Sequence, residues 1–428
     1  MSSTFNLIRN ARMFFTTNVN SVTGAIKSSG FTTSNTREIQ VLDGLSFSQA
    51  TGTETVTVNE AGTNPARGQR QFNTSLEPVE LTFSTYIRPK FNNNSTSDWI
   101  GAEEEVLWNA FAAGYVDSAP NQNELIGSAT SSDPWVNTNG DSTPVSSTGA
   151  AAAWTVSAAD ASSATPVSTL SMTNSNKNQL HKFGVIILLD ASSYAVDNCV
   201  VDQATIDFGL DAIATIAWTV RGGTLRSITA GSTTAGTFTG LTGSYKQKVT
   251  DAPFLANKLS SVTLQAYGSS PDYATGGGSP SGTEYTLALT GGSITFANNV
   301  TYLTPANLGV VNKPATYFTG TRAISGTINC YLKAGAGNSA ALLADMLTNS
   351  ATDVEPDFKL TLNIGGSSSA ATRVELNMPS AILSIPTINT EQVVSQTINF
   401  TAQGATSSAL DLDAENEITV KYYSAVTA

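Results

Sequence analysis

Residues 53–90 read TETVTVNEAGTNPARGQRQFNTSLEPVELTFSTYIRPK, and this stretch decides the fold. Val56 and Val58 alternate with polar residues at its start, and Val79, Leu81 and Phe83 alternate with polar residues near its end. Successive side chains of a strand point to opposite faces, so each run predicts a strand with one buried face and one wet face. The residues between the two runs predict a long, turn-rich excursion.

The same pattern returns in residues 293–333, SITFANNVTYLTPANLGVVNKPATYFTGTRAISGTINCYLK. Each of the two stretches is followed by a short predicted helix and then by further strands, and a repeat should reproduce the order of elements in this way. The sequence therefore predicts an internal duplication with a mainly β fold. The helices are expected at 102–113 and 339–348, and the later strands at 182–190, 199–210 and 213–222 in the first copy and 358–366, 373–386 and 393–404 in the second.

The duplication predicts the domain boundaries. One segment of the first copy, rich in Ser, Ala and Thr, has no counterpart in the second, so it should be an insertion that emerges at a loop. In chain order the predicted parts are an N-terminal arm at 1–36 with a short strand at 12–17, a first domain at 37–222 with the insertion at about 115–180, a connector at 223–258, a second domain at 259–404, and a tail at 405–428 with a final strand.

The composition excludes several functions. Charged residues make up 13% of the chain and the formal net charge is -12. Tight binding of nucleic acid requires clustered Lys and Arg side chains that contact phosphates. The excess of acidic over basic residues argues against such binding. Apolar runs fall far short of the roughly 20 residues of a membrane helix, and no secretion signal is visible at the N-terminus. We therefore expect a protein that neither inserts into a membrane nor holds DNA.

The residues of catalysis are scarce. The chain has one histidine, His181, so neither a two-His metal site nor a longer His-based relay is possible. The glycines at 276–278 lie in a Ser/Pro/Gly loop without the strand and helix of a phosphate-binding loop. Cys199 and Cys330 fall in predicted strands of different copies, which predicts buried free thiols. We expect no enzymatic activity, no cofactor and no metal.

At this point the residues carry a specific resemblance. The strings TREIQVLDGLSFSQATGTETVTVNEAG and PARGQRQFNTSLEPVELTFSTYI resemble the first half of the major tail tube protein of long, flexible-tailed, T-five-like bacteriophages. LIRNARMFFTT resembles the N-terminus of that family, and GGSITFANNVTYLTP with YFTGTRAISGTINCYL resembles its second half. The chain departs from the family in its longer insertion and in lacking the C-terminal immunoglobulin-like decoration of some members.

The resemblance implies a fold and a function. Two tandem tube domains, each a β-sandwich with a flanking short helix, would close into a β-barrel tube on oligomerisation, with three chains per pseudo-hexameric ring and about 24 strands around the lumen. Stacked rings would conduct the genome without binding it specifically. The implied partners are further copies of the chain, the tape measure protein and the tail terminator and tip proteins. The implied location is the virion tail, after assembly in the host cytoplasm.

The wet strand faces would line the lumen. Small neutral or acidic side chains suit a channel through which DNA slides, because carboxylates repel phosphates. The alternative is that these residues are only the solvent-facing side of a sandwich. The candidates are Thr55, Thr57, Glu80, Thr82, Ser84, Gln203, Thr205, Asp207, Thr295, Thr327, Asn329, Glu375, Asn377, Thr397 and Asn399.

The excursions at 59–76 and 303–320 are candidates for the contacts between stacked rings, the alternative being plain surface loops. They are too long for simple hairpin loops, contain prolines that prevent local pairing, and carry cations. The candidate residues are Glu60, Asn64, Arg67, Arg70, Asn73, Asn307, Asn312 and Lys313.

Two other functions stay open at this stage. A tandem β-sandwich adhesin would share the Ser/Thr-rich loops, but it would bind a ligand and form no axial polymer. The inner tube of a contractile tail would differ in an outer surface that binds a sheath, which the sequence does not reveal.

Overall fold

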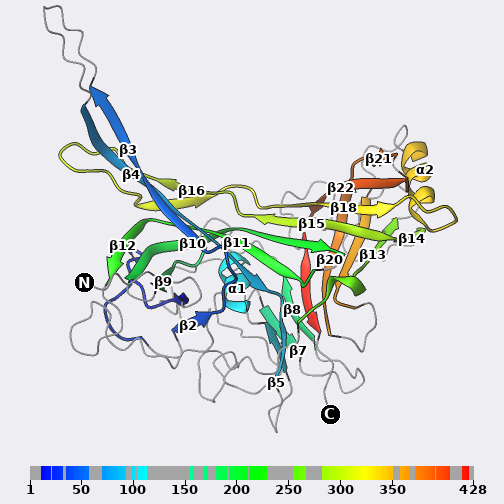
Figure 1. Cartoon of the computed structure of the whole chain (residues 1–428), viewed down its shortest axis with the longest axis horizontal. Coiled ribbons are helices and arrows are strands. Elements are labelled where there is room, and N and C mark those ends of the chain that lie inside the picture. The colour runs from blue at the N-terminus through cyan, green and yellow to red at the C-terminus, as the bar shows by residue number, and fades with distance from the viewer. Residues whose placement is uncertain are drawn as a thin grey trace, which may run out of the picture.

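The computed structural model is mainly β, as the sequence predicts (Figure 1). It describes residues 11–20, 22–31, 35–56, 70–92, 99–102, 104–112, 154–157, 167–171, 180–189, 192–210, 212–228, 254–266, 282–349, 357–366, 372–390, 392–404 and 417–423.

The first group of strands contains the N-terminal segment and runs in the order β2–β1–β9–β10–β12, all antiparallel. Strand β1 lies between two neighbours, and its Met13, Phe14 and Phe15 are buried because both faces of the strand are covered. The bounds are β1 (Arg12–Thr16), β2 (Thr36–Ile39), β9 (Phe183–Leu189), β10 (Ser192–Gly209) and β12 (Thr224–Ile228).

A second group forms the longest sheet, which we call the long sheet. It passes through both halves of the chain in the antiparallel order β3–β4–β11–β10–β15–β18–β22–β21. The junction between the halves is the pairing of β10 with β15. The bounds of the additional strands are β3 (Ser46–Val56), β4 (Arg70–Tyr86), β11 (Thr215–Gly222), β15 (Leu289–Ala297), β18 (Ala323–Tyr331), β21 (Thr387–Asn389) and β22 (Ser395–Gln403).

A third group lies at the C-terminal side, in the order β14–β13–β19–β20–β23–β8–β7. Its last two strands come from the predicted insertion; β8 pairs with the predicted final strand, β23, and β7 pairs with β8. The bounds are β7 (Trp154–Ser157), β8 (Val167–Ser171), β13 (Ser261–Ala266), β14 (Glu284–Leu287), β19 (Asp357–Ile364), β20 (Arg373–Leu383) and β23 (Thr419–Tyr423). Two separate hairpins are formed by β5 (Pro89–Asn92) with β6 (Trp99–Ala102) and by β16 (Val300–Leu303) with β17 (Thr316–Thr319).

Two long strands are shared between groups and connect them. The first part of β10 pairs with β9 and β12, and its second part pairs with β11 and β15. Asn198 stands at the change with φ 54°, a left-handed conformation that Asn adopts more readily than most residues. Strand β20 changes partner in the same way, from β23 to β22. No pairing among the described strands joins β3 to β21, so each of these strands has one paired neighbour.

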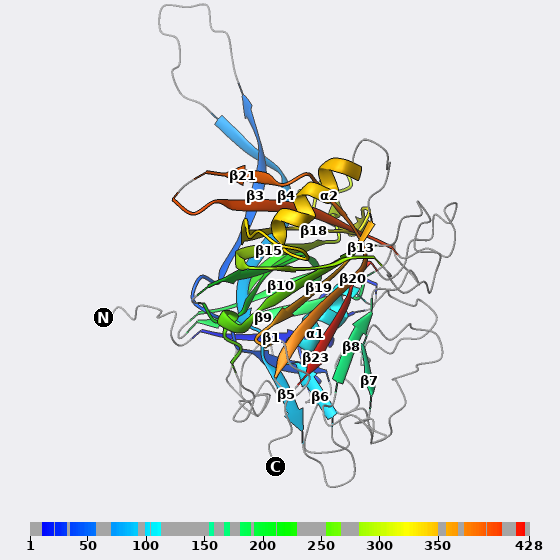
Figure 2. The same cartoon turned by 90° about the vertical axis from the view of Figure 1, so that its right-hand side faces the viewer.

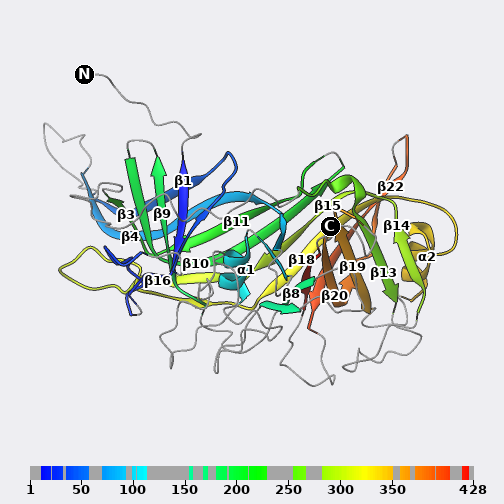
Figure 3. The same cartoon turned by 90° about the horizontal axis from the view of Figure 1, so that it is seen from below.

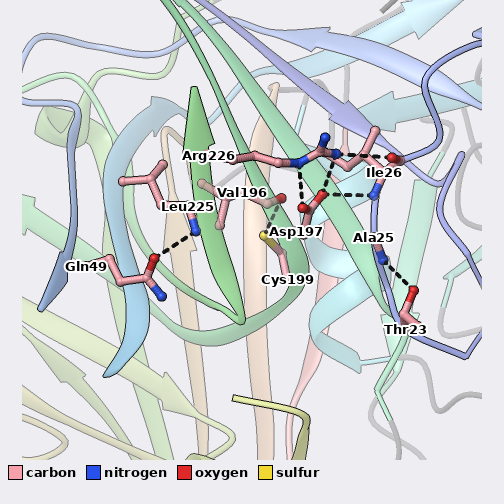
Figure 4. A network of polar contacts seen from close by, with 9 residues as sticks. All are labelled: Thr23, Ala25, Ile26, Gln49, Val196, Asp197, Cys199, Leu225 and Arg226. Atoms are coloured by element: carbon pink, nitrogen blue, oxygen red, sulfur yellow. Dashed lines mark hydrogen bonds and ion pairs between the residues drawn. The ribbon is translucent and has the colours of Figure 1, made fainter. Parts of the chain in front are cut away.

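An ion-pair network fastens the N-terminal segment to β10 and β12 (Figure 4). Asp197 accepts hydrogen bonds from Nε of Arg226 at 2.7 Å and from the backbone N–H of Ile26 at 2.8 Å. Nη2 of Arg226 also donates to the carbonyl of Ile26, at 3.1 Å. A charged hydrogen bond is stronger than a neutral one, so this network holds residues 22–31 against the sheet.

The two helices have different positions. α1 (Glu105–Ala112) packs against the apolar face of the long sheet, where the Trp108 ring meets Trp218 at 5.0 Å and Phe296 at 5.1 Å between centroids. α2 (Ser339–Asn349) lies beside β14 at the right-hand end of the molecule in Figure 1, the end that faces the viewer in Figure 2. A 3-10 turn, η4, spans Asn257–Leu259. α2 ends one residue beyond the predicted bounds, whereas α1 begins three residues later and ends one residue earlier than the sequence predicts.

The structure corrects the predicted starts of several strands, among them β10, which begins at Ser192 rather than at residue 199, and β4. The alternation in the sequence begins at Val79, but β4 begins at Arg70 and pairs with β3 along most of its length. Residues 70–74 are exposed, so neither face of the strand there has to be apolar. Alternation of apolar and polar residues indicates a strand with one buried face. It gives no signal where both faces of a hairpin are exposed to solvent. The two cysteines are buried free thiols, which confirms the prediction.

Candidate functional site

The long sheet presents one polar face across both halves of the chain. On β10, Ala204 and Ile206 are buried while Gln203 and Thr205 are half-buried on the opposite face. The alternation is the same on β15, β18 and β22, where the inward residues pack on the core that contains Trp108. Successive side chains of a strand point to opposite faces, so a sheet that is covered on one side carries apolar residues on the covered face and polar residues on the other.

Hydroxyl and amide groups pair across neighbouring strands of this polar face. The Thr205 and Thr295 hydroxyls lie 3.3 Å apart at the junction of the two halves, and Ser293 and Thr327 lie 3.3 Å apart on the next pair of strands. The Thr397 hydroxyl donates to the Asn329 amide oxygen at 2.9 Å. Cross-strand pairs of this kind each stabilise a sheet by roughly 0.2–1 kcal/mol, and these side chains are uncharged.

Most of the candidate lumen residues lie together on this face. Thr55 lies on the hairpin beyond the body of the sheet, and Thr57 falls outside the described residues. Glu375 and Asn377 lie where β20 pairs with β19 and β23, so the structure does not bring them beside the others. The residues on the polar face of the long sheet are Glu80, Thr82, Ser84, Gln203, Thr205, Asp207, Thr295, Thr327, Asn329, Thr397 and Asn399.

The sequence reasoning left out several residues of the same face, although the signal was present. Strand β11 alternates buried Ile216, Trp218 and Val220 with more exposed residues between them. Register places those intervening residues in line with candidates on β4 and β10. The additional residues are Ala217, Thr219, Arg221, Ser293, Ser325 and Thr401.

Charge on the face is sparse. Among the face residues named above, Glu80, Asp207 and Arg221 are charged. Nε of Arg221 forms an ion pair with Asp202 at 2.7 Å, and Arg221 lies opposite Glu80 in the register of β4 and β11. The guanidinium is therefore neutralised by the Asp202 carboxylate, and Arg221 is the one cation among the described face residues named above.

A long hairpin formed by β3 and β4 projects from the body of the molecule (Figure 1). Its base is fixed by Gln49, whose amide oxygen accepts the Leu225 N–H at 3.0 Å and whose amide nitrogen donates to the Gly223 carbonyl at 3.1 Å. Farther out, Phe72 is 56% exposed. An extended two-stranded ribbon is marginal in water without a partner, so this hairpin is suited to binding one.

The loop between β16 and β17 meets the hairpin near its base. Asn312 donates its N–H to the Thr74 carbonyl at 3.2 Å and accepts the Leu76 N–H at 2.8 Å. The β3–β4 hairpin and the β16–β17 loop lie at the end of the molecule opposite α2 (Figure 3). The loop exposes Leu308 fully and Val310 by 63%. Exposed apolar residues gathered on neighbouring segments indicate a surface that contacts another protein.

The stacking candidates divide between these two segments. Glu60, Asn64 and Arg67 fall outside the described residues. Arg70 and Asn73 lie in the exposed part of β4 and pair with β3. In the loop of the second half, Asn307 donates its backbone N–H to the Asn312 side chain at 2.8 Å, and Lys313 is exposed.

The β16–β17 hairpin docks on the N-terminal half and fixes the two halves to each other. The Tyr302 hydroxyl donates its one proton to the Asn198 carbonyl and shares it with the Arg221 carbonyl at 3.1 Å, and the Tyr317 hydroxyl donates to the Leu180 carbonyl. Burial raises the pKa of Tyr302 well above its ordinary value, so the hydroxyl stays a donor. His181 lies beside this contact, and burial lowers its pKa to about 4.

Among the described residues, no three His, Cys, Asp or Glu side chains are grouped so as to hold a metal ion. No helix in that part of the chain has the length and apolar character needed to cross a bilayer.

The features above describe a structural building block: a continuous neutral polar sheet face, exposed apolar excursions at one end, and a rigid aromatic core. The model of the phage tail tube protein family matches residues 137–402, which is more than half of the chain. The chain therefore belongs to the phage tail tube protein family.

The chain is also similar over nearly its whole length to one characterised member of that class. It is 26% identical to the tail tube protein pb6 of Escherichia phage T5, in an alignment that covers 96% of this chain and 74% of pb6. The resemblance to tail tube proteins of T-five-like phages is confirmed, and the protein is a structural component of a bacteriophage tail.

Proposed function

We propose that this protein is the major tail tube subunit of a long, flexible, non-contractile tail. Three chains would form a ring with six similar lobes, and rings would stack into the tube that conducts the genome into the host. The observation that carries the proposal is the polar face of the long sheet, which continues from the first half of the chain into the second without a break. A tube wall built from such faces would present the same kind of polar side chain along both halves of every subunit.

We place the polar face of the long sheet on the lumen. Its threonines, serines and amides offer DNA no fixed cation, and the Arg221 guanidinium is held by Asp202. Glu80 and Asp207 would repel phosphates over a screening length of about 8 Å at physiological ionic strength. Glu375 and Asn377 are left out of this proposed surface because they lie on another part of β20.

We also propose that the chain contains two tandem tube domains, at 37–222 and 259–404, each with a flanking helix. The strand orders support this division, because β4 pairs with β11 as β18 pairs with β22. Strands β1 and β2 pack into the first domain rather than standing apart from it. The described part of the insertion extends the third group of strands through β8 and β23.

We assign ring stacking to the projecting β3–β4 hairpin and the β16–β17 loop. Exposed apolar side chains on both segments support this, since a solvent-facing loop has no need of them. The further partners that the function requires are the tape measure protein and the terminator and tip proteins at the tube ends. The protein would assemble in the host cytoplasm and reside in the virion tail.

Negative-stain electron microscopy of the purified protein tests the function directly. Class averages along the particle axis should show three-fold rings or tubes with six similar lobes. Compact monomers that persist at high concentration, together with binding of a sugar or receptor, would instead support an adhesin.

A pair of substitutions tests the stacking surface. Leu308→Asp with Val310→Asp places charge on fully or largely exposed positions, so folding should be retained while rings fail to elongate. Val22, which is 80% exposed on the N-terminal segment, provides the matched control Val22→Asp, and this variant should form tubes of normal length. Normal tubes from the Leu308/Val310 variant would refute the assignment.

A further inference from the structure

The β3–β4 and β16–β17 hairpins leave the long sheet from the same end of its strands. β15 ends at Ala297, opposite Gln203 of β10, and the β16–β17 hairpin follows directly along the chain. The β3–β4 hairpin continues past Glu80, which lies opposite Arg221 of β11, and Arg221 lies opposite Val200 of β10. Both hairpins therefore project from the end of the long sheet where the second part of β10 begins.

The opposite end of the same strands carries another group of exposed apolar side chains. β10 ends at Gly209, β11 begins at Thr215, and Ile213 between them forms an antiparallel bridge with Ala256 of the connector. We call the four exposed side chains on these two adjoining segments the end patch. They are Leu210 (43% exposed), Ile213 (45%), Phe254 (53%) and Leu259 (64%).

The end patch is fixed to the sheet before any partner binds. Asn257 donates its N–H to the Ala212 carbonyl at 3.0 Å, which ties the connector to the segment after β10. The Phe254 ring meets the edge of Tyr86 at 5.1 Å between centroids, and the Arg88 guanidinium lies 4.3 Å from the centroid of Phe254. A surface that is already ordered loses little conformational entropy when it binds, so the end patch is suited to be a docking surface.

The second half of the chain repeats this arrangement. Strand β22 begins at Ser395, which lies opposite Tyr331 of β18, at the end of the sheet that Gly209 marks in β10. Ile388 and Val393, on the hairpin that leads into β22, are 46% and 61% exposed. Each half therefore has a projecting hairpin at one end of its strands and exposed apolar side chains at the other.

Stacking of rings in one direction requires a different surface at each face of the ring. The strands of a closed barrel run at about 35–45° to its axis, so the two ends of the long sheet fall at opposite faces. The loop that exposes Leu308 and Val310 belongs to one face, and the end patch belongs to the other. An apolar loop requires an apolar surface on the next ring, because polar groups buried against it would lose their hydrogen bonds to water.

We propose that the end patch receives Leu308 and Val310 of a chain in the adjacent ring. The β16–β17 hairpin docks on the first half of its own chain, where the Tyr302 hydroxyl meets the Asn198 carbonyl, so its loop projects from the half that carries the end patch. Adjacent rings then bury apolar side chains that are exposed in the single chain. The inference rests on the proposed function, because it requires rings that stack.

Mixing two variants that do not elongate tests this pairing. Leu308→Asp with Val310→Asp alters the loop, and Ile213→Asp with Leu259→Asp alters the end patch; each variant alone should give folded single rings. In a mixture, the intact loop of the patch variant still fits the intact end patch of the loop variant, so stacks of two rings should form and no longer ones. Negative-stain electron microscopy counts the rings in each stack. A mixture that contains only single rings would overturn the pairing, as would tubes of normal length from the patch variant alone.

Cross-linking gives a second test that does not depend on how the patch variant folds. In tubes of the Leu308→Cys, Leu259→Cys protein, a short bis-maleimide should link chains of successive rings into a ladder on denaturing gels. The run from Gln203 to Gly209 alone separates the two ends by about 20 Å, so the reagent does not join the two sites of one chain. Leu308→Cys with Val393→Cys is the matched control on the second half and should link far less. The native cysteines are buried and do not compete.

The outcomes separate the docking surface from the function. Linking of the Leu308/Val393 pair in preference to the Leu308/Leu259 pair overturns the assignment to the end patch. Long tubes in which neither pair links also overturn it, while leaving the tube function standing. Absence of rings from the unaltered protein refutes the proposed function itself.

Discussion

Protonation of His181 should destabilise this protein over a defined range of pH. His181 is 5% exposed and lies next to Leu180, whose carbonyl accepts the Tyr317 hydroxyl of the docked β16–β17 hairpin. The Lys182 ammonium lies 5.9 Å from the centroid of the same tyrosine ring, so a second cation would form in a buried site that already has one nearby. Burial lowers the pKa of His181 to about 4 from its ordinary value of 6.5.

The direction of the pH dependence follows from the pKa of His181 in the folded and in the unfolded chain. Above pH 6.5 the imidazole is neutral in both states, so its contribution to stability is fully present. Below pH 6.5 the unfolded chain binds a proton that the folded chain does not, and stability is lost until the pH reaches about 4. Integration of this difference gives a loss of about 2 kcal/mol by pH 5 and about 3 kcal/mol by pH 4.

Urea unfolding at a series of pH values measures this loss. His181 is the one histidine of the chain, so the slope between pH 7 and pH 5 belongs largely to it. His181→Gln should flatten that slope, whatever its effect on the stability at pH 7, because glutamine does not titrate. An unaltered slope in this variant would refute the reasoning, as would a wild-type stability that is constant from pH 7 to pH 5.

Three further predictions concern the core and its network. Tyr422→Phe should lower the free energy of unfolding, measured with urea, by about 3 kcal/mol. The reason is that the buried Glu104 loses a hydrogen-bond donor and Trp108 loses the acceptor that lies 3.0 Å from its Nε1. The control Tyr331→Phe, at a residue that is 44% exposed, should show almost no change. Asp197→Ala should lower the same free energy by about 2 kcal/mol, less than for a fully buried pair since Arg226 is one-third exposed, and an equal loss in the exposed Asp43→Ala would contradict this. Burial, and after it the charge of Asp197, raises the pKa of the Cys199 thiol, so iodoacetamide at pH 8 should modify Cys199 only after unfolding, as mass spectrometry of peptides would reveal; rapid modification of the native protein would rule this out.

The sequence by itself determined the strands that have one buried face. Val79, Leu81 and Phe83, or Ile216, Trp218 and Val220, alternate with polar residues because the core covers one side of them, and this signal is local. It also determined that the chain has a single histidine and that it resembles tail tube proteins, since both depend only on which residues are present and in what order.

Tertiary structure decided the matters that depend on distant neighbours. The exposed part of β4 carries no alternation because nothing covers it, so its extent emerges only from pairing with β3. Glu375 and Thr327 have similar strand patterns, yet β20 divides its partners between β23 and β22, and this division places Glu375 apart from the polar face. Which strand adjoins which is set by contacts between residues far apart in the chain, and no local pattern encodes those contacts.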